Sequence, residues 1–181
     1  MFDVSREIDF CYGHRLMDYS GKCRHLHGHN ARVVITIESS ELDERGMVLD
    51  FSEVKRTISR WIDEHLDHRM ILSRDDPAVP VLRRLGEPML LLETNPTAEN
   101  LARLIADVAL QHGFPVVEVR FWETPRCSAT CCVDRKSGTR MQVEEVNFAG
   151  GGSGDGQRRP KGPAAPPDPP SAAEPLEEGE L

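Results

Sequence analysis

The stretch Cys23-Arg24-His25-Leu26-His27-Gly28-His29-Asn30-Ala31-Arg32-Val33-Val34-Ile35-Thr36-Ile37-Glu38 combines a clear strand pattern with a dense group of metal-ligand side chains. From residue 27 to residue 38 apolar residues occupy the odd positions and mostly polar residues the even ones, which predicts a strand with one buried face. His27 and His29 share the apolar phase. Both imidazoles are therefore expected on the buried face, where each needs a hydrogen-bond partner or a metal ion.

Residues 2 to 14 repeat this pattern in the even phase, and the apolar series ends at His14. If the two strands pair as neighbours, the imidazoles of His14, His27 and His29 converge at the end of one apolar face. Three nitrogen ligands suit zinc best. The alternative is that these histidines are ordinary core or loop residues with hydrogen-bond partners.

Cys23 decides what kind of zinc site this would be. A structural site closes its shell with four protein ligands, whereas a catalytic site leaves one position open for water or substrate. Cys23 lies four positions before His27, so it can be the fourth ligand or a free thiolate beside the metal that acts as a base or nucleophile. The spacing permits both.

Composition indicates one folded domain followed by a tail. With 181 residues and 39% hydrophobic content, the chain is long enough for a single core. Residues 149–181 are rich in Gly, Pro and acidic residues and hold seven of the 13 prolines. Such a segment buries too little apolar surface to offset its ordering entropy. We therefore expect a domain over residues 1–148 and a disordered tail over residues 149–181.

Charge and hydropathy argue against several function classes. A formal net charge of -8 argues against binding to nucleic acid, which requires concentrated Lys and Arg. The chain has no apolar run of membrane-spanning length and no signal-peptide pattern at its N-terminus, so we expect a cytoplasmic protein. Five cysteines without regular spacing fit a reducing compartment, and Cys127, Cys131 and Cys132 are expected to be free thiols rather than a metal cluster.

Two amphipathic helices and a third strand complete the predicted domain. Apolar residues recur at helical spacing over residues 54–66, with Ser52 as the expected N-cap, and over residues 101–108, with Thr97 as the N-cap. Residues 116–123 alternate as a strand in which Glu123 shares the phase of Val117, Val119 and Phe121. Residues 130–146 are expected to add one or two strands, and residues 73–93, interrupted by prolines, to form a loop. The result is an α+β fold, with two helices on one face of an antiparallel sheet.

Two other sets of polar residues are site candidates. Glu123 is either part of a buried ion pair or a carboxylate that faces a ligand with N–H donors. Asp67 and His68 follow the first helix, where His68 either caps the helix C-terminus or acts in a base relay that Asp67 orients.

Six short motifs follow one another along residues 1 to 135: His14-Arg15-Leu16, Cys23-x3-His27-Gly28-His29-Asn30, Gly46-Met47-Val48-x-Asp50-Phe51, Leu66-Asp67-His68, Asn95-Pro96-Thr97-x-Glu99-Asn100 and Glu123-Thr124. In this order they resemble the 6-pyruvoyltetrahydropterin synthase family, more closely its bacterial 6-carboxytetrahydropterin synthases of queuosine biosynthesis. The resemblance implies a tunnelling fold and a homohexamer with sites at subunit interfaces. Glu123 is then expected to serve the zinc site of a neighbouring chain.

The resemblance also implies roles for the candidate residues. His14, His27 and His29 would hold zinc, and Cys23 would accept a proton. His68 with Asp67 would be the relay that promotes the thiolate. Glu123 would grip the pterin ring and join the proton relay, and Thr97 would add ring contacts.

The implied substrate is 7,8-dihydroneopterin triphosphate, which loses triphosphate without a redox cofactor. The three-residue gap between Cys23 and His27 resembles the bacterial enzymes and favours a 6-carboxy product with release of acetaldehyde. The alternatives are a 6-pyruvoyl product, cleavage of the dihydroneopterin side chain, or a non-enzymatic structural zinc module in which Cys23 closes the shell.

Overall fold

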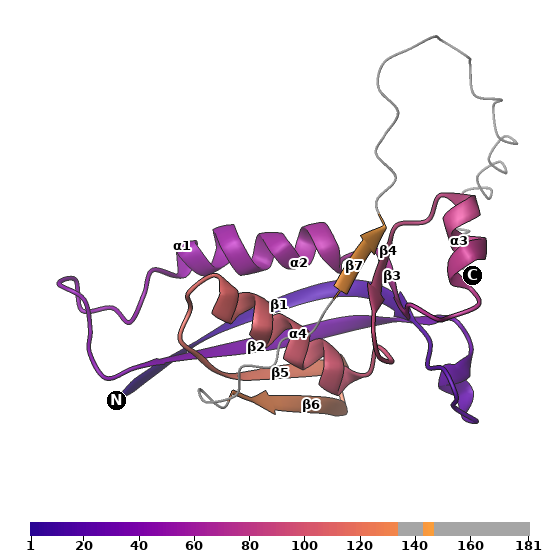
Figure 1. The fold of residues 1–181 in the computed structure, drawn as a ribbon. Helices are drawn as coiled ribbons and strands as arrows, with labels where there is room; N and C mark the ends of the chain where they lie inside the picture. Colours follow the sequence, from indigo (N-terminus) through magenta and orange to yellow (C-terminus); the bar gives the residue numbers. More distant parts are fainter. Residues whose placement is uncertain (134–142, 147–181) are drawn as a thin grey trace, which may run out of the picture. The chain divides into compact units, whose positions relative to one another are not determined.

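The computed structural model describes residues 1–133 and 143–146 of the chain. Residues Met1–Ala149 form one compact unit, and the predicted disordered tail lies outside the described residues. The elements in chain order are β1 Phe2–His14, η1 Lys22–Arg24, β2 His27–Ser39, α1 Phe51–Val54, η2 Lys55–Ser59, α2 Arg60–His65, β3 Arg69–Ser73, α3 Val79–Leu85, β4 Met89–Leu92, α4 Ala98–Gln111, β5 Val116–Thr124, β6 Cys127–Cys132 and β7 Val143–Val146 (Figure 1).

The strands of the described residues form one sheet in the order β6-β5-β2-β1-β3-β4-β7. The long strands β1 and β2 are antiparallel neighbours along their whole length, as expected, and their last pair is His14 opposite His27. The α+β class is confirmed. The sheet is mixed rather than antiparallel throughout, because β3 runs parallel to both β1 and β4. Helix α2 precedes β3 and helix α3 precedes β4, and each carries the chain back for a parallel pairing.

Two helices pack on the same face of the sheet, as the periodicity predicts. Segments α1, η2 and α2 form one continuous helix, in which η2 is a π-helical stretch, and its buried side chains are Val54, Ile58 and Ile62. Helix α4 lies beside it over β5 and β6 (Figure 1). Its buried residues follow from the expected apolar series: Leu101, Ala102, Leu104, Ile105, Ala106, Val108 and Ala109.

The N-cap of α4 is Thr97, whose side chain accepts a hydrogen bond from the Asn100 N–H group. The predicted N-cap of the first helix is wrong. That helix begins at Phe51, and its cap is Asp50, whose carboxylate accepts from the Ser52 N–H group at 2.8 Å. Asp50 is the stronger choice because its carboxylate is an ionised acceptor facing the positive end of the helix dipole.

The prediction of a loop over residues 73–93 is also wrong. This segment contains α3, with proline in its first turn and Gly86 as its C-cap at a φ of 79°, and then strand β4. The four residues of β4 are all buried, so the alternation that marks a one-sided strand is missing. Leu90 and Leu92 join the main core, whereas Met89 and Leu91 pack in a second cluster near α3.

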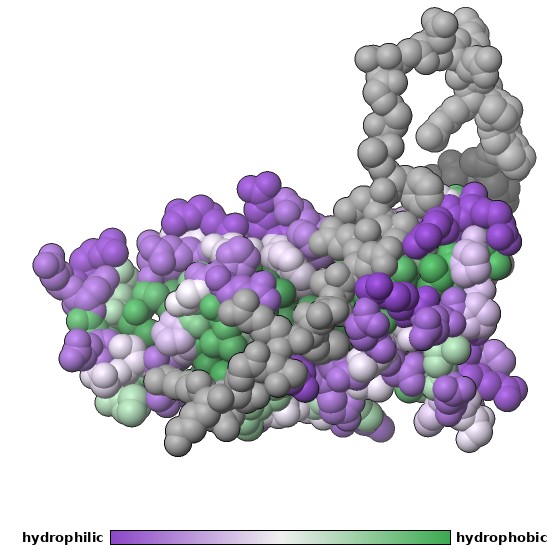
Figure 2. All heavy atoms as spheres, in the orientation of Figure 1, coloured by the Kyte–Doolittle hydropathy of each residue, from purple (hydrophilic) through white to green (hydrophobic). Residues whose placement is uncertain are grey.

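The main core lies between the sheet and the two helices. Its fully buried large side chains include Ile35, Ile37, Ile58, Ile62, Leu66 and Phe121. In the view of Figure 2, hydrophilic residues cover the outer side of the helix at the top and hydrophobic ones show beneath it. The pairing of β2 with β5 shifts its register at Ile37. At the start of β5, Val116 is therefore buried and Val117 only half-buried, whereas the predicted alternation places Val117 on the buried face. Within the described residues, every helix is too short or too polar to cross a membrane.

Candidate metal centre

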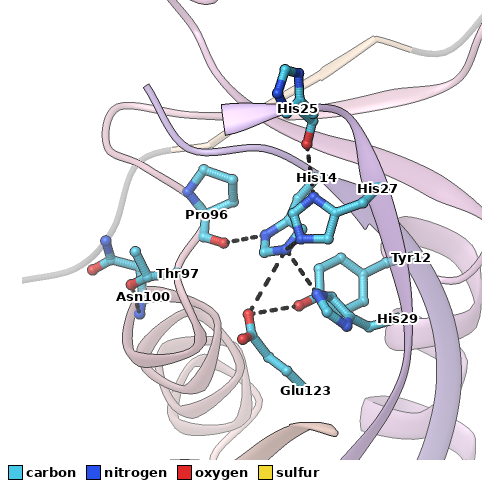
Figure 3. Close-up of polar contacts among 9 residues, drawn as sticks. All are labelled: Tyr12, His14, His25, His27, His29, Pro96, Thr97, Asn100 and Glu123. Carbon is cyan, nitrogen blue, oxygen red and sulfur yellow. Dashed lines mark hydrogen bonds and ion pairs between the residues drawn. The ribbon is translucent and has the colours of Figure 1, made fainter. Parts of the chain in front are cut away.

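Three imidazoles meet at one end of the β1–β2 pair. His14 is the last residue of β1 and His27 the first of β2, and alternation places His29 on the same face. The Nε2 atom of His14 lies 3.1 Å from Nε2 of His27 and 3.2 Å from Nε2 of His29. The three rings point toward one another (Figure 3). The convergence that the two strand phases predict is therefore present in the fold.

The hydrogen bonds of these rings leave nitrogen lone pairs facing each other. His14 donates from Nδ1 to the Pro96 carbonyl and His27 from Nδ1 to the His25 carbonyl, both at 2.8 Å. A carbonyl only accepts, so the proton of each neutral ring is on Nδ1 and Nε2 is free to bind a metal. A tetrahedral zinc ion with bonds of about 2.0–2.1 Å holds its nitrogen ligands about 3.3 Å apart. The donor set fits such an ion.

Burial favours the neutral form of His14 and His29. It lowers the pKa of His14 below its usual value of 6.5, and the neighbouring histidines lower it further, against the bond to Pro96 and the charge of Glu123. Burial also lowers the pKa of His29, and the neighbouring His27 adds to this effect. Neutral imidazole is the form that binds a metal.

Glu123 comes to this cluster from β5. Its Oε1 atom lies 3.9 Å from His14 Nε2 and accepts a hydrogen bond from the Tyr12 hydroxyl at 3.1 Å. The pairing between β5 and β6 is irregular between Trp122 and Thr124, and such bulges re-aim a side chain. Glu123 thus lies beside the histidines of its own chain, and the expectation that it serves the zinc site of a neighbouring chain stays a prediction.

Tyr12 is a residue of this cluster that the sequence did not single out. It shares the phase of His14 on β1, and only 3% of it is exposed. Burial, and then the charge of Glu123, raise the pKa of the Tyr12 phenol well above its ordinary value, so the hydroxyl remains a donor. Tyr12 lies two positions before His14, so the two side chains share a face of the strand, and this spacing could have indicated that Tyr12 belongs to the cluster. An aromatic side chain at such a position is, however, typical of an ordinary core residue.

The motif Asn95-Pro96-Thr97-x-Glu99-Asn100 supports the cluster through its backbone. The Asn95 side chain accepts from the Met17 N–H group at 2.7 Å and donates to the Met17 carbonyl at 2.9 Å. These bonds tie the segment after β1 to the segment before α4, where the Pro96 carbonyl orients His14. Thr97 caps α4 at the same place, near the histidines (Figure 3).

Cys23 lies in the short turn η1 between β1 and β2. Its thiol is half-buried, unpaired in any disulfide, and close enough to Tyr12 for its charge to raise the pKa of that phenol. It does not belong to the group formed by His14, His27 and His29, whose ligand atoms all lie within 4.8 Å of one another. This placement favours a thiol beside the metal over a fourth ligand.

Asp67 and His68 belong to a second group, with Cys11, on the opposite face of β1. Asp67 Oδ1 accepts from the Cys11 N–H group at 2.8 Å, and Oδ2 accepts from His68 Nδ1 at 2.8 Å. His68 donates its own N–H group to the Cys11 carbonyl and has a φ of 55°, a strained value for a residue other than glycine. Asp67 thus orients the ring of His68, whose side chain is otherwise largely exposed.

A pocket of about 750 Å³ lies at this second group, and its lining includes Asn30, Arg32, Asp67, His68 and Trp122 but none of the three clustered histidines. A smaller pocket of about 330 Å³ is lined by both His29 and His68. The single chain therefore presents the Asp67–His68 pair and the histidine cluster as separate groups, and His68 and His29 both line one small pocket.

Comparison with known proteins gives the family. Residues 3–133 match the family described as 6-pyruvoyl tetrahydropterin synthase. The chain belongs to this family. A curated relative from Rickettsia conorii, named 6-carboxy-5,6,7,8-tetrahydropterin synthase, is 34% identical over 134 residues, which are 70% of this chain and 97% of that protein. The resemblance that the six motifs carry is thereby confirmed.

Two solved structures share the fold. An uncharacterized protein from Wolinella succinogenes matches with a TM-score of 0.61 at 30% identity, over 74% of this chain and 98% of that one. The 6-pyruvoyl tetrahydropterin synthase of Caenorhabditis elegans matches with a TM-score of 0.55 at 25% identity, over 74% of this chain and 96% of that one. The α+β unit of residues Met1–Ala149 therefore has the tunnelling fold.

Proposed function

We propose that this chain is a zinc-dependent lyase that converts 7,8-dihydroneopterin triphosphate to 6-carboxy-5,6,7,8-tetrahydropterin, with loss of triphosphate and acetaldehyde, as a step of queuosine biosynthesis. The observation that carries the proposal is the meeting of three imidazoles: the Nε2 atoms of His27 and His29 lie 3.1 and 3.2 Å from His14 Nε2, with a Glu123 carboxylate oxygen 3.9 Å from it. The name of the Rickettsia conorii relative supports the choice of product.

His14, His27 and His29 would hold the zinc ion. The ion would supply a Lewis acid that polarises the substrate side-chain oxygens and acidifies the neighbouring C–H bonds. Pro96 and His25 support this role, because their carbonyls accept from the Nδ1 atoms and so fix the tautomer and the ring direction.

Cys23 would take the proton from the substrate side chain. A thiolate is the reactive form of cysteine, and a nearby cation favours it. Glu123 has room for a second role: Oε1 accepts from Tyr12, and Oε2 remains for the N–H groups of a pterin ring. Thr97 follows Pro96, whose carbonyl accepts from His14, and would add a ring contact.

Asp67 and His68 would complete the proton relay. Asp67 holds His68 Nδ1, so the opposite ring nitrogen is directed away from Asp67 and can exchange a proton. Because this pair forms a group apart from Cys23 in one chain, the relay role requires a second copy to bring His68 of one chain to Cys23 of another. The proposal therefore includes a homo-oligomer with shared sites, a hexamer by the family resemblance.

The test is a product assay on the zinc-loaded full chain. The protein is incubated with 7,8-dihydroneopterin triphosphate, and the products are identified by mass spectrometry, with Cys23→Ala alongside. A 6-carboxy product with acetaldehyde, absent with the variant, supports the proposal. A 6-pyruvoyl product, or side-chain cleavage alone, would move the chain to another activity of the same family.

The non-enzymatic alternative is a closed structural zinc module. It requires sulfur from Cys23 in the first coordination shell, and X-ray absorption at the zinc edge measures this directly. A shell of nitrogen and oxygen ligands alone would exclude the module, whereas a zinc–sulfur distance of about 2.3 Å would favour it.

A further inference from the structure

The ring of Tyr12 packs against the histidine cluster. Its ring centroid lies 5.0 Å from that of His14 in an edge-on arrangement, and 5.7 Å from that of His29. On the other side its ring packs edge-on against Phe121 and tilted against Phe10, with both centroids within 5.9 Å. Packing from both sides leaves the ring little freedom, so the position of its hydroxyl is set by the core.

The Tyr12 hydroxyl meets the carboxylate oxygen that lies nearest His14. It donates to Glu123 Oε1 at 3.1 Å, and that same oxygen is 3.9 Å from His14 Nε2. By comparison, the Nε2 atoms of His27 and His29 lie 3.1 and 3.2 Å from His14 Nε2. Glu123 Oε1 is thus adjacent to the candidate ligand set but farther out than its members.

A carboxylate beside a metal site can either bind the metal or accept hydrogen bonds from other groups. Carboxylate oxygens are ordinary zinc ligands, and a fourth protein ligand would close the shell to substrate. A hydrogen bond from a rigidly held donor takes up one lone pair of the oxygen and sets where that oxygen lies relative to the metal. The geometry provides such a donor in Tyr12, whose hydroxyl meets the Glu123 carboxylate beside His14 (Figure 3).

We propose that Tyr12 is a positioning residue, whose hydroxyl holds Glu123 beside the metal but outside its coordination shell. One metal position is thereby kept open for oxygen atoms of the substrate, and the Glu123 carboxylate is kept for a ligand with adjacent N–H donors. The inference rests on the proposed function for the identity of that ligand, a pterin, but its metal readouts do not need turnover.

The experiment compares metal binding in the full chain and in Tyr12→Phe, which removes only the hydroxyl. Cobalt(II) replaces zinc, and its visible absorption reports the number and type of ligands. In Tyr12→Phe we expect a changed cobalt spectrum and, by competition with a chelator, zinc binding at least threefold tighter. With 7,8-dihydroneopterin triphosphate, KM should rise about tenfold, the value of one hydrogen bond. In the double variant Tyr12→Phe with Glu123→Gln, the cobalt spectrum should return to that of the parent.

The matched control is Tyr19→Phe, at the second tyrosine of the chain, which is 49% exposed. This variant should match the parent in all these measurements. If Tyr12→Phe changes only the thermal midpoint, and its cobalt spectrum and zinc affinity equal those of Tyr19→Phe, Tyr12 is a packing residue and the inference is overturned.

Glu123→Gln alone provides a check that does not depend on the folding of Tyr12→Phe. If Glu123 lies outside the shell in the parent, this variant leaves the cobalt spectrum unchanged. A changed spectrum means that Glu123 is a ligand already and overturns the inference, as does a parent chain that binds no metal. Absence of pterin turnover with the expected metal readouts would instead count against the proposed function alone.

Discussion

At the scale of single residues, substitution of Cys23 tests whether metal binding and proton transfer are carried out by different residues. Because its thiol lies outside the three-histidine group, Cys23→Ala should retain zinc at one ion per chain and lose turnover by at least 100-fold, within the usual range for a general base. Metal analysis and single-turnover kinetics measure the two effects. His14→Ala is the contrasting variant and should lose the metal. Joint loss of metal and turnover in Cys23→Ala would support the closed shell.

At the scale of elements, the β1–β2 pair makes the cluster possible, and two glycines let its strands approach at that point. A Cβ atom on Gly28 would lie 3.0 Å from the backbone oxygen of Tyr12, so the strands would have to separate beside His27 and His29. Gly28→Ala should lower the free energy of unfolding by roughly 1–3 kcal/mol, as overpacking does, and should weaken zinc binding. Denaturant unfolding and chelator competition measure the two changes.

Gly13→Ala is the matched control, because Gly13 pairs with Gly28 across the same strands. Its added Cβ would clash with the sulfur of Met70, and a flexible methionine can move aside. We expect a smaller loss of stability than in Gly28→Ala. If the two substitutions lowered the stability equally, the close approach of the two strand backbones at Gly28 would not be the cause of the effect.

The cap of the first helix gives a pH-dependent prediction. Hydrogen bonding from the Ser52 backbone lowers the pKa of Asp50 below its ordinary value of 3.8. A carboxyl whose pKa is lowered by folding stabilises the fold above the unfolded pKa, and this contribution is lost as the pH falls through the folded pKa. Asp50→Asn keeps a neutral cap, so it should be less stable than the parent at pH 7, and the difference should shrink below pH of about 4. Urea unfolding at several pH values measures this, and a difference independent of pH would contradict it.

At the scale of the whole molecule, zinc should contribute to stability, because its ligands come from two strands that only the fold brings together. A ligand that binds the native state alone, at 100 times its Kd, stabilises that state by about 2.7 kcal/mol. Removal of the metal with a chelator should therefore lower the thermal midpoint, and added zinc should restore it. In His14→Ala the chelator should have no effect on the midpoint.

The tail gives a second prediction at this scale. Residues Met1–Ala149 form a compact unit, and the family match ends at residue 133. A chain that ends after Ala149 should keep its zinc content and should keep kcat/KM within about twofold, since the candidate site, in the part of the chain that the structure describes, draws on no residue beyond Glu123. Steady-state kinetics on the shortened and full chains measure this. A large loss would assign a role to the tail.

Several features could be predicted from the sequence because they depend on local periodicity. The phases of β1 and β2 predict that His14, His27 and His29 share a face, and antiparallel pairing brings them together. The caps and apolar series likewise predict α4 with Thr97 at its start. Strand β4 and the parallel pairing of β3 could not be predicted in this way, because a strand buried on both faces carries no alternating pattern.

The sequence by itself thus determined the family, the strand pair and the three metal-ligand candidates, since motif order and side-chain period are properties of the chain. Only the tertiary structure decided how β5 meets β1: it placed Glu123 on its own chain's histidines and the Tyr12 hydroxyl on Glu123. It also put Asp67 and His68 with Cys11, on the opposite face. These contacts join residues far apart in sequence, and their distances depend on bulges, ring packing and backbone hydrogen bonds that no local pattern encodes.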